Sequence, residues 1–179
     1  MKKHLFLATF SLLLSASLAH AQLGTSTGTT TVSVAVAAEA ALTVNTGTST
    51  LTSTGTNFSS YTGSTALTYF IRTTPTSGSG SVTLKVTTDF APTGGPSVAS
   101  PPTATDALTY NCTVSSPGTA CTGPLTAKTT ATTSVATFAA DSHSAFAGNS
   151  ASVAWTLTND PLYKVATYTA TVTFTISAA

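Results

Sequence analysis

Two cysteines offer the clearest chemistry in this sequence. Cys112 and Cys121 are the only cysteines of the chain, and Ser116-Pro117 lies near the middle of the segment between them. Turn residues at that position predict a hairpin that brings the two sulfurs opposite each other. The spacing differs from the C-x-x-C of redox and metal pairs, and no histidine lies nearby in the sequence. We therefore predict a structural disulfide between Cys112 and Cys121.

A polar cluster, Asp141-Ser142-His143-Ser144, places an acid, an imidazole and two hydroxyls within four residues. A catalytic triad, however, is assembled from separated segments, and its serine needs a strained turn or an oxyanion hole. Four adjacent residues do not meet these demands. We expect a polar loop here, no catalytic residues and no enzymatic activity.

Oxygen donors for a cation are present but dispersed along the chain. No segment has the ligand density of a D-x-D-x-D-G calcium loop. Asn159-Asp160-Pro161 is better explained as a turn, because aspartate before proline favours extended backbone and side-chain capping. We therefore expect neither a metal nor a cofactor, although four residues carry suitable oxygens: Asp141, Asn149, Asn159 and Asp160.

Aromatic residues suggest contacts of two kinds. Trp155 is the only tryptophan, and Val153 and Leu157 share its face of a predicted strand, so we expect a core residue rather than a stacking platform. Other aromatic residues fall in predicted loops and are candidate contacts for a carbohydrate or another surface. These are Phe58, Tyr61, Phe90 and Phe146.

Alternation with a period of two predicts the elements that position these residues. From Tyr168 to Ile176 one face carries Tyr, Ala, Val, Phe and Ile, while the other carries only Thr. We expect the threonines to form a solvated strand face, with ice binding as the alternative for such a ladder. Similar patterns predict strands over residues 32–36, 67–71, 82–86, 108–114 and 153–157, with shorter candidates at 42–44, 51–52 and 135–138.

Short strands separated by Gly, Pro and Asn turns predict an all-β fold, an antiparallel two-sheet immunoglobulin-like sandwich. An outer-membrane barrel would also need alternation. It would require longer strands and aromatic girdles, which the sequence lacks. The sandwich is therefore the expected fold class.

The N-terminus predicts export. Lys2 and Lys3 precede an apolar run from Leu5 to Leu14, and Ala19-His20-Ala21 fits a signal-peptidase site. The run is shorter than the roughly 20 residues of a spanning helix. We expect a signal peptide over 1–21, a flexible tail over 22–31 and a single sandwich domain over 32–179, located in the periplasm, at the cell surface or outside the cell.

Charge excludes one class of partner. After residue 21 the chain carries four lysines and arginines against five aspartates and glutamates, a net charge of −1. No excess of basic residues remains to bind a phosphate backbone, so we expect no nucleic-acid partner. We also expect no membrane span.

The stretch Trp155-Thr156-Leu157-Thr158-Asn159-Asp160-Pro161 through Thr167-Tyr168-Thr169-Ala170-Thr171-Val172-Thr173-Phe174 resembles the closing strands of secreted bacterial immunoglobulin-like modules. The chain ends where such modules add another strand. In this it is similar to fimbrial subunits and spore-coat-U-like proteins, in which a neighbour supplies a missing strand.

The resemblance implies a structural or surface-associated protein that assembles through strands. Residues 31–37 could act as the donated strand or pair within their own molecule, and the second interpretation is favoured. The candidate assembly residues lie near the two ends of the chain: Val32, Val34, Val36, Tyr168, Val172, Phe174 and Ile176. An extracellular carbohydrate- or surface-binding module is the alternative function.

Overall fold

The computed structural model describes residues 27–179, so the predicted signal peptide and part of the predicted tail lie outside the described residues. The chain divides into two units, residues 1–34 and 35–179, and every strand of the described part belongs to the second unit. Residues 27–179 contain strands and turns without any helix, and therefore no helix that could cross a membrane.

One antiparallel sheet has six strands. Its order is β1-β3-β9-β5-β7, and the short strand β2 pairs with the start of β3. Glu39 pairs with Arg72 where β1 meets β3, and Tyr61 pairs with Leu157 where β3 meets β9. The strands are β1 (Glu39–Val44), β2 (Thr52–Ser53), β3 (Tyr61–Arg72), β5 (Thr109–Val114), β7 (Leu125–Thr126) and β9 (Asn149–Leu157).

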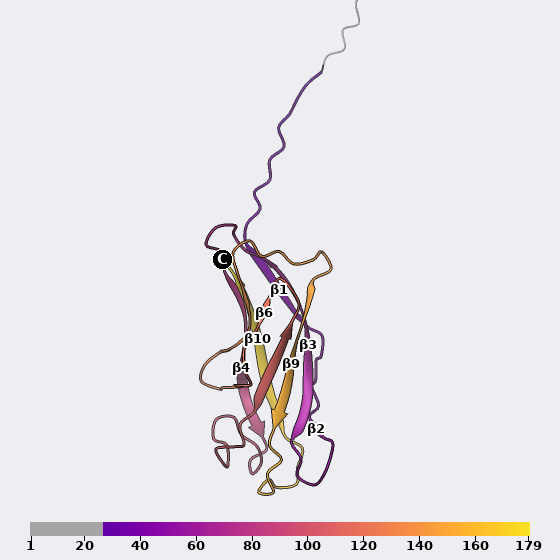
Figure 1. Cartoon of the computed structure of the whole chain (residues 1–179), viewed down its shortest axis with the longest axis vertical. Helices are drawn as coiled ribbons and strands as arrows, with labels where there is room; N and C mark the ends of the chain where they lie inside the picture. The colour runs from indigo at the N-terminus through magenta and orange to yellow at the C-terminus, as the bar shows by residue number, and fades with distance from the viewer. Residues whose placement is uncertain (1–26) are drawn as a thin grey trace, which may run out of the picture. The chain divides into compact units, whose positions relative to one another are not determined.

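A second antiparallel sheet has four strands in the order β10-β4-β8-β6. The two sheets pack face to face, with the strands running along the length of the second unit (Figure 1). The predicted β-sandwich is thus confirmed. The strands of this sheet are β4 (Gly80–Ala91), β6 (Thr119–Ala120), β8 (Thr133–Phe138) and β10 (Thr169–Ala178).

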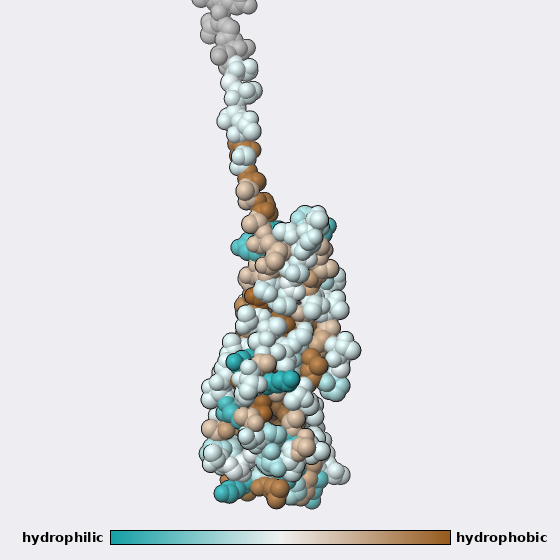
Figure 2. All heavy atoms as spheres, turned by 90° about the vertical axis from the view of Figure 1, so that its left-hand side faces the viewer, coloured by the Kyte–Doolittle hydropathy of each residue, from teal (hydrophilic) through white to brown (hydrophobic). Residues whose placement is uncertain are grey.

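The period-two pattern explains the two layers. In β4, Val82, Leu84 and Val86 are fully buried, whereas Lys85 lies on the opposite face and pairs with Thr173 of β10. The threonines of β10 are all exposed, as the alternation predicts. The surface in Figure 2 is accordingly mostly pale, the shade of residues of intermediate hydropathy, since hydroxyls rather than charges cover the strands.

The top and the bottom of the sandwich are distinguished by which strands begin or finish there. The start of β1 and the end of β10 lie at one end, because Glu39 pairs with Arg72 and the carbonyl of Ala179 accepts hydrogen bonds from the neighbouring Thr74 and Ser79 amides. We call this the top end, as drawn in Figure 1. The opposite, bottom end carries the start of β3, the end of β9 and the start of β10.

The cysteine pair does form a disulfide, but the predicted hairpin is wrong. Gly118 N donates to the carbonyl of Ser115, so a turn is present at the expected place. The strands on either side nevertheless belong to different sheets, since β5 pairs with β9 and β6 pairs with β8. The chain crosses from one layer to the other at this turn, and the disulfide therefore joins the two sheets.

The predicted strand over residues 32–36 is also absent, and the first strand begins at Glu39. Val32, Val34 and Val36 are 89%, 84% and 64% exposed. A strand needs a partner for its backbone groups and its apolar face, and none of the described residues pairs with this segment. The pairing within its own molecule that the sequence favoured is not present.

Candidate functional site

A groove of about 1100 Å³ lies at the bottom of one edge of the sandwich, between β1 and β10. These two strands are the edge strands of the two sheets, and no strand among the described residues pairs with the outer edge of either. We call this space the edge groove. Its apolar lining includes Val44, Leu51, Tyr61, Trp155, Val172 and Phe174.

The floor of the edge groove is rigid core. Trp155 is 5% exposed, its ring stacks at a tilt on Tyr110 with centroids 5.5 Å apart, and its indole nitrogen donates to Thr65 Oγ1 at 2.8 Å. The prediction that Trp155 anchors the core is confirmed. Because Trp155 also lines the edge groove, its fluorescence can report on what fills the groove.

The walls of the edge groove are apolar and incompletely covered. Val172 and Phe174 point inward from β10 but are only half-buried, whereas their partners in β4, Val86 and Leu84, are completely buried. Across the groove, Val44 of β1 is exposed. Apolar surface left open along one edge is the kind of surface that a partner covers.

The opposite edge of the sandwich is closed. There the Cys112–Cys121 disulfide links β5 to the residue after β6, with a Cα–Cα distance of 5.5 Å. Cys121 N also donates to the carbonyl of Val135 in β8. The sheets are therefore tied together by a covalent bond at the β5 and β6 edge, whereas the edge groove opens between β1 and β10 at the bottom end.

Polar residues gather at the bottom rim of the edge groove, in the loop between β9 and β10. Tyr168 precedes β10, and its hydroxyl donates to the carbonyl of Lys164. Leu162 N donates to Asp160 Oδ1, which confirms the turn predicted at Asn159-Asp160-Pro161. Burial, together with the nearby carboxylates of Asp106 and Asp160, raises the pKa of Tyr163 to about 12. The Tyr163 phenol is thus neutral at physiological pH.

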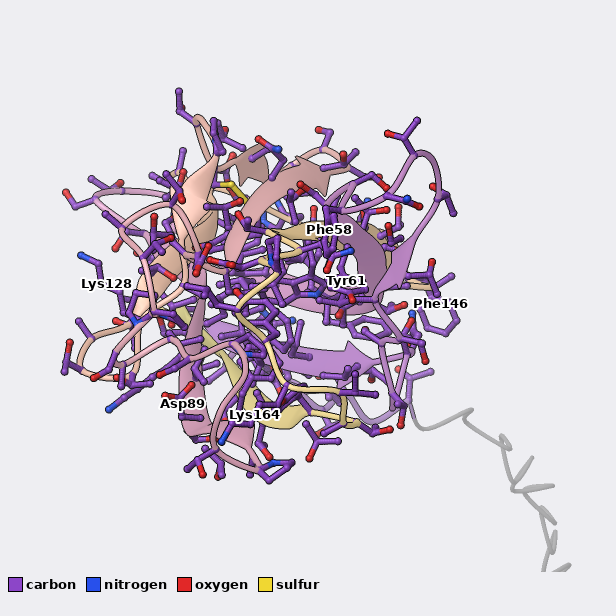
Figure 3. The ribbon with its side chains drawn as sticks, turned by 90° about the horizontal axis from the view of Figure 1, so that it is seen from below. Phe58, Tyr61, Asp89, Lys128, Phe146 and Lys164 are labelled. Carbon is purple, nitrogen blue, oxygen red and sulfur yellow. A yellow bond between two sulfur atoms is a disulfide. The ribbon has the colours of Figure 1, made fainter. Side chains whose placement is uncertain are left out.

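The candidate carbohydrate contacts divide between the two ends. Phe58, Tyr61 and Phe90 all line the edge groove. Phe146 does not, because it lies in the loop that follows His143, which bridges to Arg72 at the top end. Figure 3, a view from the bottom end, accordingly draws Phe58 and Tyr61 close together and Phe146 at the margin.

The polar cluster at residues 141–144 is a loop of the top end. His143 Nε2 lies 3.6 Å from Asp141 Oδ1, and both side chains are more than half exposed. Ser144 uses its hydroxyl on the backbone of Ile71, accepting from the amide and donating to the carbonyl. Ser142 is buried, and its amide donates to Thr73 Oγ1. The hydroxyl of Ser144 therefore makes two hydrogen bonds that hold the loop against β3.

The four possible cation ligands do not converge. Asn149 is engaged on both sides of its amide, accepting from Ala145 N and donating to the carbonyl of Ser116. Asn159 and Asp160 lie on the rim of the edge groove, while Asp141 lies at the top end. Within residues 27–179 no three His, Cys, Asp or Glu side chains are grouped as a metal site would require.

Comparisons with family models, with curated proteins and with solved structures return no match for this chain. The edge groove and the unpaired segment therefore stand on their own geometry. Sequence reasoning identified the inward residues of β10 and the valines of residues 32–36. It missed Leu51 and Tyr163 as part of the same site, because loops distant in the sequence bring them to the groove.

Proposed function

We propose that this chain is an exported, noncatalytic structural protein that assembles with copies of itself, and that the edge groove of one copy receives residues 31–37 of another. One combination of observations carries the proposal. The chain holds an unpaired segment with three exposed valines on one face, and it also holds a sandwich with an uncovered apolar edge. Each feature provides what the other lacks.

The two parts match in chemistry. A strand added beside β10 would pair with its free backbone edge, and alternate valines would enter the groove over Val172 and Phe174. Burying one valine contributes about 1.5–3 kcal/mol. Residues 169–178 also contain no charge, although exposed edge strands are usually protected from pairing by charges or prolines. An unprotected edge is expected where pairing is the function.

A donor from another copy fits better than the chain's own segment. To enter its own groove, the chain would have to reverse direction between Val36 and Glu39, where Ala37 and Ala38 provide neither glycine nor asparagine for a tight turn. The carbonyl of Ala37 is in addition held by Arg72 Nε at 2.7 Å, and Arg72 pairs with Glu39. Both contacts hold the residues before β1 in line with that strand, so that the segment does not turn back toward its own groove.

Export and the structural role rest on two further supports. The disulfide is of the kind that persists in oxidising compartments, in agreement with the predicted signal peptide. The resemblance to fimbrial subunits and spore-coat-U-like proteins implies the same assembly mode. We therefore place the protein outside the cytoplasm, in a coat- or fimbria-like assembly.

The test is the size of the chain from Gln22 onward, measured by size-exclusion chromatography with light scattering. We expect assemblies larger than one chain. The variant Val32→Asp, Val34→Asp and Val36→Asp should elute as a monomer, because each aspartate would place a charge in an apolar groove.

The matched control carries the same three charges on the other face of the segment, as Ser33→Asp, Ala35→Asp and Ala37→Asp. It should still assemble, since those side chains would point away from the groove. Monomers from the unsubstituted chain, or equal behaviour of the two variants, would refute the proposal.

A carbohydrate-binding module is the second candidate, because three of its candidate aromatics line the same groove. Phe58, Tyr61 and Phe90 lie there with Asp160 and Asn57 on the rim. A glycan array probed with the monomeric aspartate variant distinguishes the two functions. Binding that disappears in Tyr61→Ala would favour this candidate, and no binding would leave the groove to the donated strand.

A further inference from the structure

We propose that the chain cleaves its own peptide bond between Asp160 and Pro161, in the loop between β9 and β10. The step is independent of the proposed function, and each chain reacts once, using a side chain of this loop and water. Asp160-Pro161 is the only Asp-Pro pair of the sequence. It lies in a turn whose hydrogen bonds hold the carboxylate and the carbonyl of Asp160 in place.

The turn fixes both reacting groups of Asp160. Leu162 N donates to Asp160 Oδ1 at 2.7 Å, which holds the side chain over the turn and leaves Oδ2 as the nucleophile. Tyr163 N donates to the carbonyl oxygen of Asp160 at 3.0 Å. A donor on that oxygen polarises the carbonyl and stabilises the negative charge that develops there when its carbon is attacked.

Residues on both sides of the turn are anchored to the rest of the domain. Before it, Thr158 Oγ1 donates to the carbonyl of Thr105 at 2.8 Å. After it, the phenol oxygen of Tyr163 is buried, and Lys164 N donates to the carbonyl of Gly94 at 2.8 Å. Folding has therefore already removed much of the conformational freedom that the two groups would otherwise lose on reacting.

The reaction balances with one water molecule. Asp160 Oδ2 attacks the carbonyl carbon of its own residue and closes a cyclic anhydride. The bond from that carbon to the nitrogen of Pro161 breaks, and the nitrogen takes a proton from solvent and leaves as a secondary amine. Water then opens the anhydride, so that Asp160 becomes a C-terminal residue with its side chain restored. Proline favours the step because its alkylated nitrogen accepts the proton readily.

Water and protons reach the turn. Asp160 and Pro161 line the edge groove, and Leu162 is 69% exposed. The titratable side chains of this corner are those of Asp106, Asp160, Tyr61, Tyr163 and Lys164. Because the tyrosines are neutral at physiological pH, two carboxylates face one ammonium group, and this excess of negative charge favours a proton on the leaving nitrogen. The rate should therefore rise as the pH is lowered from 7 to 5.

Incubation of the folded chain from Gln22 onward at pH 5, followed by mass spectrometry under denaturing conditions, tests the proposal. We expect two products, residues 22–160 and 161–179. They should form about tenfold faster than in the same chain unfolded in urea, since one donor to a developing oxyanion contributes about 10²–10³ in a buried site and less in an exposed turn.

Two variants serve as a matched pair, and circular dichroism establishes that both are folded. Asp160→Asn should stay intact, because an amide is a weaker nucleophile than a carboxylate. Asp141→Asn, in the loop at the top end, should cleave at the rate of the parent chain.

Hydroxylamine separates the anhydride route from hydrolysis by a contaminating protease. In its presence the parent chain should yield a hydroxamate on Asp160. An intact parent chain, an equal rate in urea, cleavage of Asp160→Asn or cleavage without a hydroxamate would each overturn the proposal.

Discussion

Among single residues, Asp89 shows how a charge can hold a loop in a nearly uncharged protein. Its carboxylate accepts from the backbone amides of Phe90, Val98 and Ala99 and from the Ser97 hydroxyl, at 2.6–3.1 Å. Burial raises the pKa of Asp89, but the four hydrogen bonds outweigh it and hold the pKa below its ordinary value. The loop after β4 is thereby fixed at the bottom end.

This arrangement predicts a pH dependence. Because the folded pKa of Asp89 is lower than that in the unfolded chain, its contribution to stability is complete above about pH 4 and is lost as the pH falls through the folded value. Asp89→Asn should reduce the free energy of unfolding by about 1–3 kcal/mol at pH 7. Urea titrations at pH 7 and pH 3 should show the difference between variant and parent shrinking at pH 3. A constant difference would contradict this account.

The disulfide makes a prediction of its own. Its two cysteines are 9 residues apart in the sequence, and closing a loop of that size stabilises a chain by about 2–3 kcal/mol. Cys112→Ser with Cys121→Ser should lower the free energy of unfolding by this amount in urea. Reduction of the parent chain with a thiol should lower the free energy of unfolding by the same amount. The same treatment should not change the stability of the double variant. Equal stability of all forms would show that the disulfide does not tie the sheets.

At the level of elements, alternation was a reliable guide wherever a strand has a covered face. It located β4, β9 and β10 and assigned Val153, Trp155 and Leu157 to the core. The same parity explains why Lys85 lies on the outer face of β4. These predictions succeeded because the side-chain period of two is a local property of the backbone.

Which strands pair with each other depends on the whole fold, and the sequence pattern was not sufficient to predict it. The valines of residues 32–36 have the pattern of a strand, but a strand also needs a neighbour. The turn between the cysteines was recognised, yet its flanking strands join different sheets, which only the packing of both layers decides. The edge groove depends on loops around Leu51 and Tyr163, and no local pattern places these together.

The edge strand β10 and residues 31–37 can be tested apart from assembly. A chain starting at Glu39 lacks the donated segment and should accept a peptide of residues 29–38. We expect saturable binding with a shift of Trp155 fluorescence to shorter wavelength, since the peptide excludes water from the groove beside the only tryptophan. At a peptide concentration of about 100 times the Kd, the chain should gain about 2.7 kcal/mol of stability.

The control peptide carries aspartate in place of Val32, Val34 and Val36. It should neither shift the fluorescence nor raise the stability of the chain. If both peptides bound equally well, the recognition would lie in the backbone alone and the apolar match between segment and groove would be refuted.

On the scale of the whole molecule, the two edges of the sandwich differ. One edge is tied by the disulfide between the sheets, and the other holds the edge groove at its bottom end. Under the proposed function, the fixed edge would keep the two sheets at a constant spacing while the edge groove receives a strand. This arrangement suits a building block of a polymer, in which each copy must present the same groove to the next.

Hydrogen–deuterium exchange on the assembled chain, compared with the monomeric aspartate variant, tests the central claim most directly. The account predicts that the backbone amides of residues 32–36 and of the outer edge of β10 are protected in the assembly and exchange rapidly in the monomer, because they pair with each other only between copies. Rapid exchange of residues 32–36 in the assembly would contradict it, since the copies would then be held together by some other surface.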